Sequence, residues 1–192
     1  MQLRYLAGVS AVVGALAAGI VTAGAFSVDE RFPWTVGKGG MVGSSPVQRA
    51  TVSYQSNLPP GSLVISTAER RLYFILGNGQ AIRYGIGVGR PGFTWSGLKH
   101  VSAKKEWPDW TPPSQMLARR PDLPRHMKGG PENPLGARAM YLGSTLYRIH
   151  GSNEPETIGQ AVSSGCFRLT NDDVIDLYER VRIGATVLIK QN

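Results

Sequence analysis

The sequence has few of the residues that build disulfides and metal sites. Its 192 residues include one cysteine, Cys166, and three histidines, His100, His126 and His150. A single thiol cannot form an internal disulfide, and no zinc-finger spacing of cysteine and histidine occurs. A lone cysteine is most often a small buried core residue, so a functional Cys166 needs further support from its surroundings.

Acidic residues are also scarce. Thirteen of them are set against 21 lysines and arginines, which gives a net charge of +8 and favours polyanionic partners. The chain has no recognition-helix, zinc-finger or RNA-binding motif, so nucleic acid is not the expected partner. An anionic wall polymer or a lipid surface remains. The apolar fraction of 42% is typical of a globular protein.

The N-terminal residues predict export. Residues 1–4 form a short basic head, residues 5–25 are apolar, and Ala23, Gly24 and Ala25 form an A-x-A cleavage pattern. This is the organisation of a signal peptide. Because the apolar run is long, an uncleaved signal anchor is the alternative. Either segment places the folded part in the periplasm or cell envelope, where a free thiol has to be buried or used.

Residues 26–57 lack helical or strand periodicity and are predicted to be a linker, with one folded domain at residues 58–192. Apolar and alternating runs predict strands at 62–67, 71–76, 81–88, 137–142, 144–150 and 185–190. One helix is predicted at 171–181, with Thr170 as its cap and Asp173 three residues on. The fold class is therefore mainly β, a sandwich or barrel with one clear helix.

Residues 104–134 are predicted to be a long, stiff loop. Seven of the thirteen prolines fall there, together with Trp107 and Trp110. Loops of this length are usually lids or binding loops, and the two tryptophans would offer apolar contact to a substrate. The alternative is a surface loop whose tryptophans pack into the main core.

Residues 87–92 have the spacing G-x-G-x-x-G. We reject a dinucleotide site, because Pro91 and Gly92 do not open a helix and an exported protein meets no nicotinamide pool. Glycines at the end of a strand and in a turn explain the spacing.

Cys166 and His150 provide the two side chains needed to make a thiolate nucleophile at neutral pH. His150 ends a predicted strand, where a rigid sheet can present a catalytic side chain. Its ring needs a partner that fixes the tautomer, and the backbone carbonyl of Gly151 is the candidate. The amides of Gly165 and Cys166 are the candidates for an oxyanion hole.

Three residues beside the cysteine are predicted to contact substrate. Ser163 and Ser164 are small and leave room for an acyl group. Arg168 lies two residues after Cys166, so on an extended strand both side chains share a face, and its guanidinium could hold a substrate carboxylate. The alternative is an ion pair between Arg168 and an acidic residue near Asp172. No catalytic role is expected for His100 or His126.

At these residues the sequence is similar to the L,D-transpeptidases of the YkuD (ErfK/YbiS) family. The signature is His150-Gly151 followed by the run from Ser163 through Gly165-Cys166 to Arg168, and the resemblance covers roughly residues 58–192. Two departures occur: Ser164 replaces the histidine often found before Gly-Cys, and Arg168 stands where some members have asparagine. They leave nucleophile and base intact but put any second histidine at the site in doubt.

The resemblance implies an L,D-transpeptidase-type β-sandwich and acyl transfer on peptidoglycan. Cys166 would attack the bond between the diamino acid residue and the terminal D-alanine of a stem peptide. The thioester would pass to the amine of a second stem, giving a 3–3 cross-link, or to an outer-membrane protein or lipoprotein. Water or a free D-amino acid are further acceptors. The resemblance implies no metal or organic cofactor. It also implies that carbapenems acylate Cys166.

Three rival functions remain open. An L,D-carboxypeptidase or endopeptidase would share the acyl-enzyme and differ only in using water. A sortase-like transpeptidase also uses Cys, His and Arg, although its His and Cys are expected to lie much further apart. A non-catalytic wall-binding module is disfavoured by the joint presence of Cys166, His150 and Arg168.

Overall fold

The computed structural model describes residues 45–191, and the predicted signal segment and most of the predicted linker lie outside that range. Nine strands form one sheet in the order β1-β4-β3-β2-β11-β6-β7-β8-β10, and β5 pairs separately with β9. The strands are β1 Ala50–Ser53, β2 Leu63–Ser66, β3 Arg71–Gly77, β4 Gln80–Gly85, β5 Val88–Gly89, β6 Gly97–Glu106, β7 Arg138–Leu142, β8 Arg148–His150, β9 Ala161–Ser163, β10 Phe167–Arg168 and β11 Thr186–Lys190; the helices are α1 Ser114–Arg119, the 3-10 turn η2 Pro155–Thr157 and α2 Asn171–Arg180.

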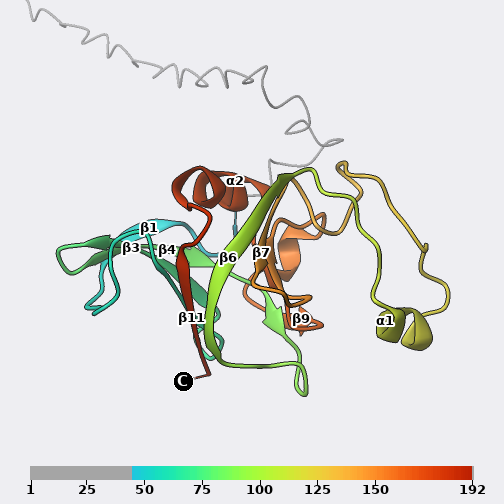
Figure 1. The fold of residues 1–192 in the computed structure, drawn as a ribbon, viewed down its shortest axis with the longest axis horizontal. Helices are drawn as coiled ribbons and strands as arrows, with labels where there is room; N and C mark the ends of the chain where they lie inside the picture. The colour runs from blue at the N-terminus through green and yellow to red at the C-terminus, as the bar shows by residue number, and fades with distance from the viewer. Residues whose placement is uncertain (1–44, 192) are drawn as a thin grey trace, which may run out of the picture. The chain divides into compact units, whose positions relative to one another are not determined.

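The long strand β6 joins the two halves of the sheet. Its first residues pair with β11, with His100 opposite Thr186. After a shift in register between Val101 and Ala103, its later residues pair with β7. Such an irregularity increases the twist and bends the strand, so β6 leads from one half of the sheet to the other beside β7 (Figure 1).

The main core lies on one face of the sheet. Leu63 and Ile65 of β2 point into it, whereas Val64 of the same strand joins a second, smaller cluster on the opposite face. Alternate residues of a strand face opposite sides, so β2 is buried on both faces. This two-sided burial explains its continuous apolar sequence.

Helix α2 covers the main core with Val174 and Leu177. Its N-terminus begins as predicted, because the Thr170 hydroxyl accepts the Asp173 amide hydrogen. Lys104 donates from its Nζ to the carbonyls of Tyr178 and Val181 near the other end of the helix. The cation thus satisfies carbonyl groups that a helix leaves unpaired at its C-terminus.

The prediction of a mainly β fold with few helices is confirmed. The predicted linker at residues 26–57 is wrong at its C-terminal end. Strand β1 lies within that range and pairs with β4, so folded structure begins before residue 58. The prediction of one long loop at residues 104–134 is also wrong in part, because the range includes the end of strand β6 and helix α1. Helix α1 lies apart from the strands at the end of this excursion (Figure 1).

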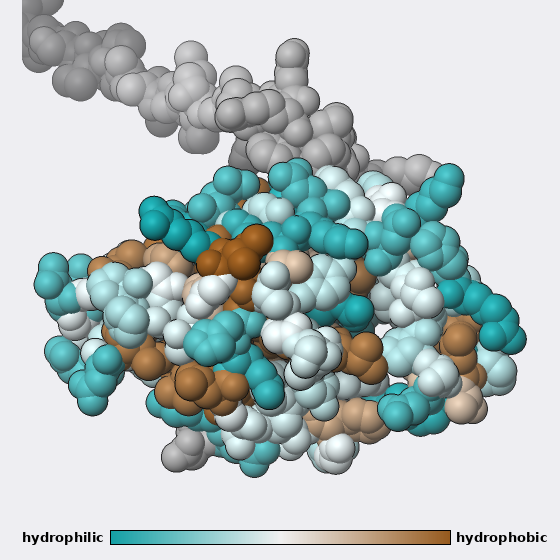
Figure 2. Space-filling model, viewed as in Figure 1, coloured by the Kyte–Doolittle hydropathy of each residue, from teal (hydrophilic) through white to brown (hydrophobic). Residues whose placement is uncertain are grey.

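Polar residues cover much of the visible face, and apolar residues appear there in separate patches (Figure 2). Among residues 45–191, the large hydrophobic side chains that remain exposed are Leu76, Leu98, Leu146 and Ile183. The same part of the chain contains no helix of the length and apolarity needed to cross a bilayer.

Candidate active site

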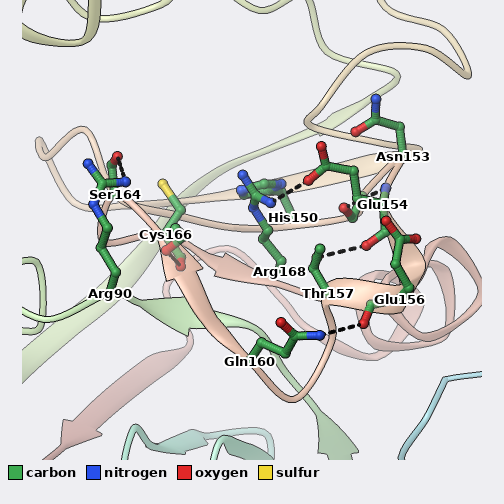
Figure 3. Close-up of polar contacts among 12 residues, drawn as sticks. Arg90, His150, Asn153, Glu154, Glu156, Thr157, Gln160, Ser164, Cys166 and Arg168 are labelled. Atoms are coloured by element: carbon green, nitrogen blue, oxygen red, sulfur yellow. Dashed lines mark hydrogen bonds and ion pairs between the residues drawn. The ribbon is translucent and has the colours of Figure 1, made fainter. Parts of the chain in front are cut away.

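Strands β8 and β10 bring the predicted functional residues together. They pair in parallel with Arg168 opposite His150. Cys166 precedes Arg168 by two residues, and Arg148 precedes His150 by two. Opposite residues of neighbouring strands, and residues two apart within a strand, share a face of the sheet. One face therefore carries Arg148, His150 and Arg168. Cys166 lies directly before β10 and beside His150 and Arg168 in the close-up, where all three are labelled (Figure 3).

His150 is held in one orientation. Its side chain is buried, and its Nδ1 lies 2.6 Å from the carbonyl oxygen of Gly151. A carbonyl only accepts, so Nδ1 carries the proton and Nε2 is the basic nitrogen. Burial, followed by the charge of Arg168, lowers the pKa of His150 to about 3, whereas the Gly151 carbonyl acts in the opposite direction. The imidazole is therefore neutral at neutral pH.

The thiol of Cys166 is half-buried and also neutral. Its Sγ donates to the carbonyl of Leu146 at 3.8 Å. Burial raises the pKa of Cys166, while Arg148 and Arg168 act to lower it. Both shifts favour a neutral thiol beside a neutral imidazole in the resting site.

The loop before Cys166 is fixed by Ser163. The Ser163 hydroxyl donates to the Cys166 carbonyl at 2.6 Å and accepts the Gly165 amide hydrogen at 3.1 Å. Ser163 is buried, so it holds the loop and is not placed to contact substrate. The Gly165 amide is already paired, which removes it from the predicted oxyanion hole in this state and leaves the Cys166 amide as the candidate.

Gly165 itself is required by the loop. Its φ is +108°, and a Cβ there would lie 2.5 Å from Cε1 of Tyr147. Trp95 also restrains this loop. Its ring stacks on the Tyr147 ring with the centroids 4.4 Å apart, and its Nε1 donates to the Gly165 carbonyl at 2.9 Å. Sequence reasoning missed Trp95, which lies seventy residues from Gly165.

Arg168 forms an ion pair, with a different partner from the one considered. Its Nη1 lies 3.0 Å from Oε2 of Glu154, which is about half exposed. Glu154 follows β8 in the chain and is not near Asp172 in sequence. The guanidinium therefore lies beside the thiol and already holds a carboxylate.

Two further arginines flank the cysteine and were not predicted. Arg148 places its guanidinium carbon 5.1 Å from the centroid of the Tyr141 ring. Arg90 donates from Nη1 to the Ser164 hydroxyl at 3.4 Å. The alternation of residues 146–150 could have indicated Arg148, because it shares a face with His150; nothing in the sequence brought Arg90 to the site.

Trp107 and Trp110 lie at the base of the 104–134 excursion. The Trp107 amide donates to the carbonyl of Ala137, and its φ is +40°. Trp110 forms an isolated antiparallel bridge with Met127, which ties the two arms of the excursion together. Both side chains are partly buried, so substrate contact by these tryptophans stays a prediction.

Residues 87–92 form a strand end and a turn, as expected. Strand β5 ends at Gly89, and the Phe93 amide donates to the Arg90 carbonyl. No helix follows in the positions where a dinucleotide site needs one. Within residues 45–191, no three of the His, Cys, Asp and Glu side chains come together as a metal site.

Comparison with known proteins shows the family of this fold and site. The family model of the YkuD L,D-transpeptidase catalytic domain matches residues 60–189. Probable L,D-transpeptidase YbiS of Escherichia coli K12 is 40% identical over 134 residues, which are 65% of this chain and 43% of that protein. Probable L,D-transpeptidase ErfK/SrfK of the same strain is 38% identical over 136 residues. The chain thus spans less than half the length of these relatives.

Solved structures agree on the fold. L,D-transpeptidase 3 from Mycobacterium tuberculosis has a TM-score of 0.55 at 18% identity, covering 69% of this chain and 62% of that chain, which supports the fold alone. A Brucella melitensis protein described as a probable carnitine operon oxidoreductase caia is 43% identical, with a TM-score of 0.52, covering 74% of this chain and 92% of that chain. With its sheet, its Cys-His site and a family match over 130 residues, the chain belongs to the YkuD family of L,D-transpeptidase catalytic domains.

Proposed function

We propose that this protein is an L,D-transpeptidase that acts on peptidoglycan stem peptides through a thioester on Cys166. The observation that carries the proposal is the pairing of β8 with β10, which brings Cys166, directly before β10, beside His150 (Figure 3), a histidine whose Nδ1 is fixed by the Gly151 carbonyl. A nucleophile, a base and a group that orients the base are the three parts of an acyl-transfer site.

The first half-reaction forms the acyl-enzyme. His150 Nε2 takes the proton of the Cys166 thiol as the sulfur attacks the carbonyl carbon between the diamino acid residue and the terminal D-alanine. The resulting tetrahedral intermediate collapses, the carbon–nitrogen bond breaks, and His150 returns the proton to the departing amine. D-Alanine leaves, and the stem remains attached through a carbon–sulfur bond.

The second half-reaction releases the thioester. An acceptor amine attacks the thioester carbonyl, His150 takes the amine proton, and the sulfur leaves as a thiolate that is then reprotonated. The favoured acceptor is the side-chain amine of a second stem. A protein amine, as in attachment of an outer-membrane protein or lipoprotein, and a free D-amino acid fit the same chemistry.

The neutral resting pair needs help when charge develops on sulfur. Arg148 and Arg168 both favour the charged form of Cys166. A bound peptide that displaces water would strengthen these interactions by lowering the local dielectric constant. The site would therefore be activated by donor binding.

Location and inhibitor chemistry follow from the same proposal. The signal peptide at residues 1–25 and a periplasmic or cell-envelope location are proposals that rest on the sequence pattern. L,D-transpeptidase 3 from Mycobacterium tuberculosis is described in complex with a faropenem-derived adduct. We expect carbapenems to acylate Cys166 of this chain, by attack of the thiolate on the strained lactam carbonyl.

Incubation with purified disaccharide-tetrapeptides tests the function. The expected products by mass spectrometry are free D-alanine and a 3–3 cross-linked dimer, both absent with Cys166→Ala. Shortening of tetrapeptide to tripeptide with no dimer would identify the alternative, an L,D-carboxypeptidase. Absence of D-alanine release from any stem by the wild-type protein would contradict both.

A further inference from the structure

The turn that follows β5 lies directly against the loop of the candidate nucleophile. The Arg90 amide donates to the Ser163 carbonyl at 3.0 Å. A Cβ on Gly89 would lie 3.3 Å from the Gly165 Cα and 2.4 Å from the Phe93 carbonyl oxygen. The glycine therefore permits a close backbone approach, and the Arg90 side chain starts from a fixed point beside the cysteine loop.

Two arginines from distant parts of the chain meet at one aromatic ring in this turn. The guanidinium carbon of Arg90 lies 4.2 Å from the centroid of the Phe93 ring, and that of Arg119, the last residue of α1, lies 5.2 Å from the same centroid. The ring brings the two cations close enough for one peptide to contact both. Helix α1 thereby links the 104–134 excursion to the rim of the site.

Neither guanidinium has a carboxylate partner within residues 45–191. The arginines of that part of the chain that do form ion pairs are Arg49, Arg120, Arg138, Arg168 and Arg180. Two like charges held at one ring repel each other, and an anion bound beside them would reduce that cost. Planar guanidiniums suit a carboxylate because both groups can pair through two parallel hydrogen bonds.

Arg90 and Arg168 lie on opposite sides of the Cys166 side chain (Figure 3). Arg90 donates to Ser164, two residues before Cys166, while Arg168 lies two residues after it. Figure 3 accordingly shows Cys166 between the Arg90–Ser164 contact on one side and His150 with Arg168 on the other. Cationic side chains thus flank the sulfur on both sides.

We propose that Arg90 and Arg119, held against Phe93, form a second anion subsite that binds a carboxylate of the donor peptide on the side of Cys166 opposite Arg168. The inference rests on the proposed function and specifies its donor. A donor whose diamino acid residue carries a side-chain carboxylate, as diaminopimelate does, and which ends in D-alanine has a carboxylate on each side of the scissile carbonyl. Two cationic subsites that bracket the sulfur match two carboxylates that bracket the bond.

Binding to the inactive Cys166→Ala protein tests the subsite without requiring turnover. Three tetrapeptides serve as probes: one with both carboxylates free, one amidated on the diaminopimelate side chain, and one amidated at the C-terminus. Calorimetry should show that each amidation weakens binding, by roughly tenfold or more for the carboxylate that Arg90 and Arg119 hold, as expected for loss of a charge-assisted contact. Adding Arg90→Gln should weaken the unmodified peptide by a similar factor and abolish the effect of that same amidation.

Arg119→Gln should give a smaller loss in the same direction, and Arg125→Gln, an exposed arginine of the same excursion, serves as the control for total charge. The inference is overturned if Arg90→Gln leaves both amidation effects at their original size, or if Arg125→Gln weakens binding as much as Arg90→Gln does. Failure of the proposed function is separate: the active protein would then release no D-alanine from any of the three peptides.

Discussion

The Nδ1 atom of His150 lies 2.6 Å from the carbonyl oxygen of the next residue, Gly151. This contact fixes the tautomer without a third side chain. It also places a histidine in a buried position where its charged form is disfavoured. The free energy of unfolding should therefore depend on pH.

The stability of the fold should depend on pH through His150. Burial lowers its folded pKa to about 3 from 6.5, so the unfolded chain binds more protons than the folded chain between these values. Stability is then fully present above about pH 6.5 and falls as the pH drops towards 3, by up to about 1.4 kcal/mol per pH unit. Chemical denaturation of the wild type at pH 6.5 and 5.5 measures this slope where carboxylates of ordinary pKa remain largely ionised.

His150→Gln should flatten the slope in the same window, because glutamine has no proton to bind. The matched control is His126→Gln, since His126 is exposed in the 104–134 excursion. An unchanged slope in His150→Gln would mean that the histidine is protonated to the same extent in the folded and unfolded chains.

Cys166→Ala should remove acylation and leave the fold almost unchanged. The side chain is half-buried, and its hydrogen bond to the Leu146 carbonyl is long, at 3.8 Å. Replacing it should therefore change the free energy of unfolding by less than about 1 kcal/mol. Intact-protein mass spectrometry with a carbapenem, run beside thermal unfolding, checks both halves. A large loss of stability would instead support a core cysteine.

The site could be predicted from the sequence where local chemistry determines structure. The strand that ends at His150-Gly151 predicted the contact between the His150 ring and the Gly151 carbonyl, which the structure contains. The helix cap at Thr170 could be predicted because the Asp173 amide follows it at a fixed spacing. In each case the determining contacts lie within a few residues or on one strand face.

The missed features depend on contacts between distant residues. Strand β6 has a mostly exposed sequence with little apolar alternation, so only its pairing with β11 and β7 makes it a strand. The hydrogen bond of Trp95 spans seventy residues, and Arg90 meets Arg119 through a third side chain. The hydroxyl of Ser163, expected at the substrate, is used by its own loop.

Glu154→Gln should improve donor binding. Glu154 occupies the Arg168 guanidinium at 3.0 Å while remaining about half exposed. An exposed pair of this kind contributes about 0–1 kcal/mol to stability, so thermal unfolding should change little. Removing the charge frees Arg168 for a substrate carboxylate, and KM for the tetrapeptide should fall by a few fold with kcat nearly constant.

The effect requires Arg168, so Glu154→Gln should change nothing further in an Arg168→Gln background. Arg168→Gln alone should raise KM. A rise in KM for Glu154→Gln would indicate that the carboxylate orients Arg168 for the donor and does not compete with it.

Gly165→Ala should distort the nucleophile loop. The residue has φ +108°, and a Cβ would lie 2.5 Å from the Tyr147 ring, whereas Gly143, at φ +60°, has open space around its Cβ position. Gly143→Ala therefore measures the cost of an alanine in the left-handed region, about 1 kcal/mol. The φ of Gly165 lies outside that region, so backbone and ring together should cost Gly165→Ala at least about 1 kcal/mol more. Because Trp95 and Ser163 both form hydrogen bonds with this loop, D-alanine release should fall together with stability.

Adding Tyr147→Ser opens space for the methyl group and should recover part of the loss that Gly165→Ala causes. Equal losses in Gly143→Ala and Gly165→Ala would show that neither the Tyr147 ring nor the φ of Gly165 restrains this loop.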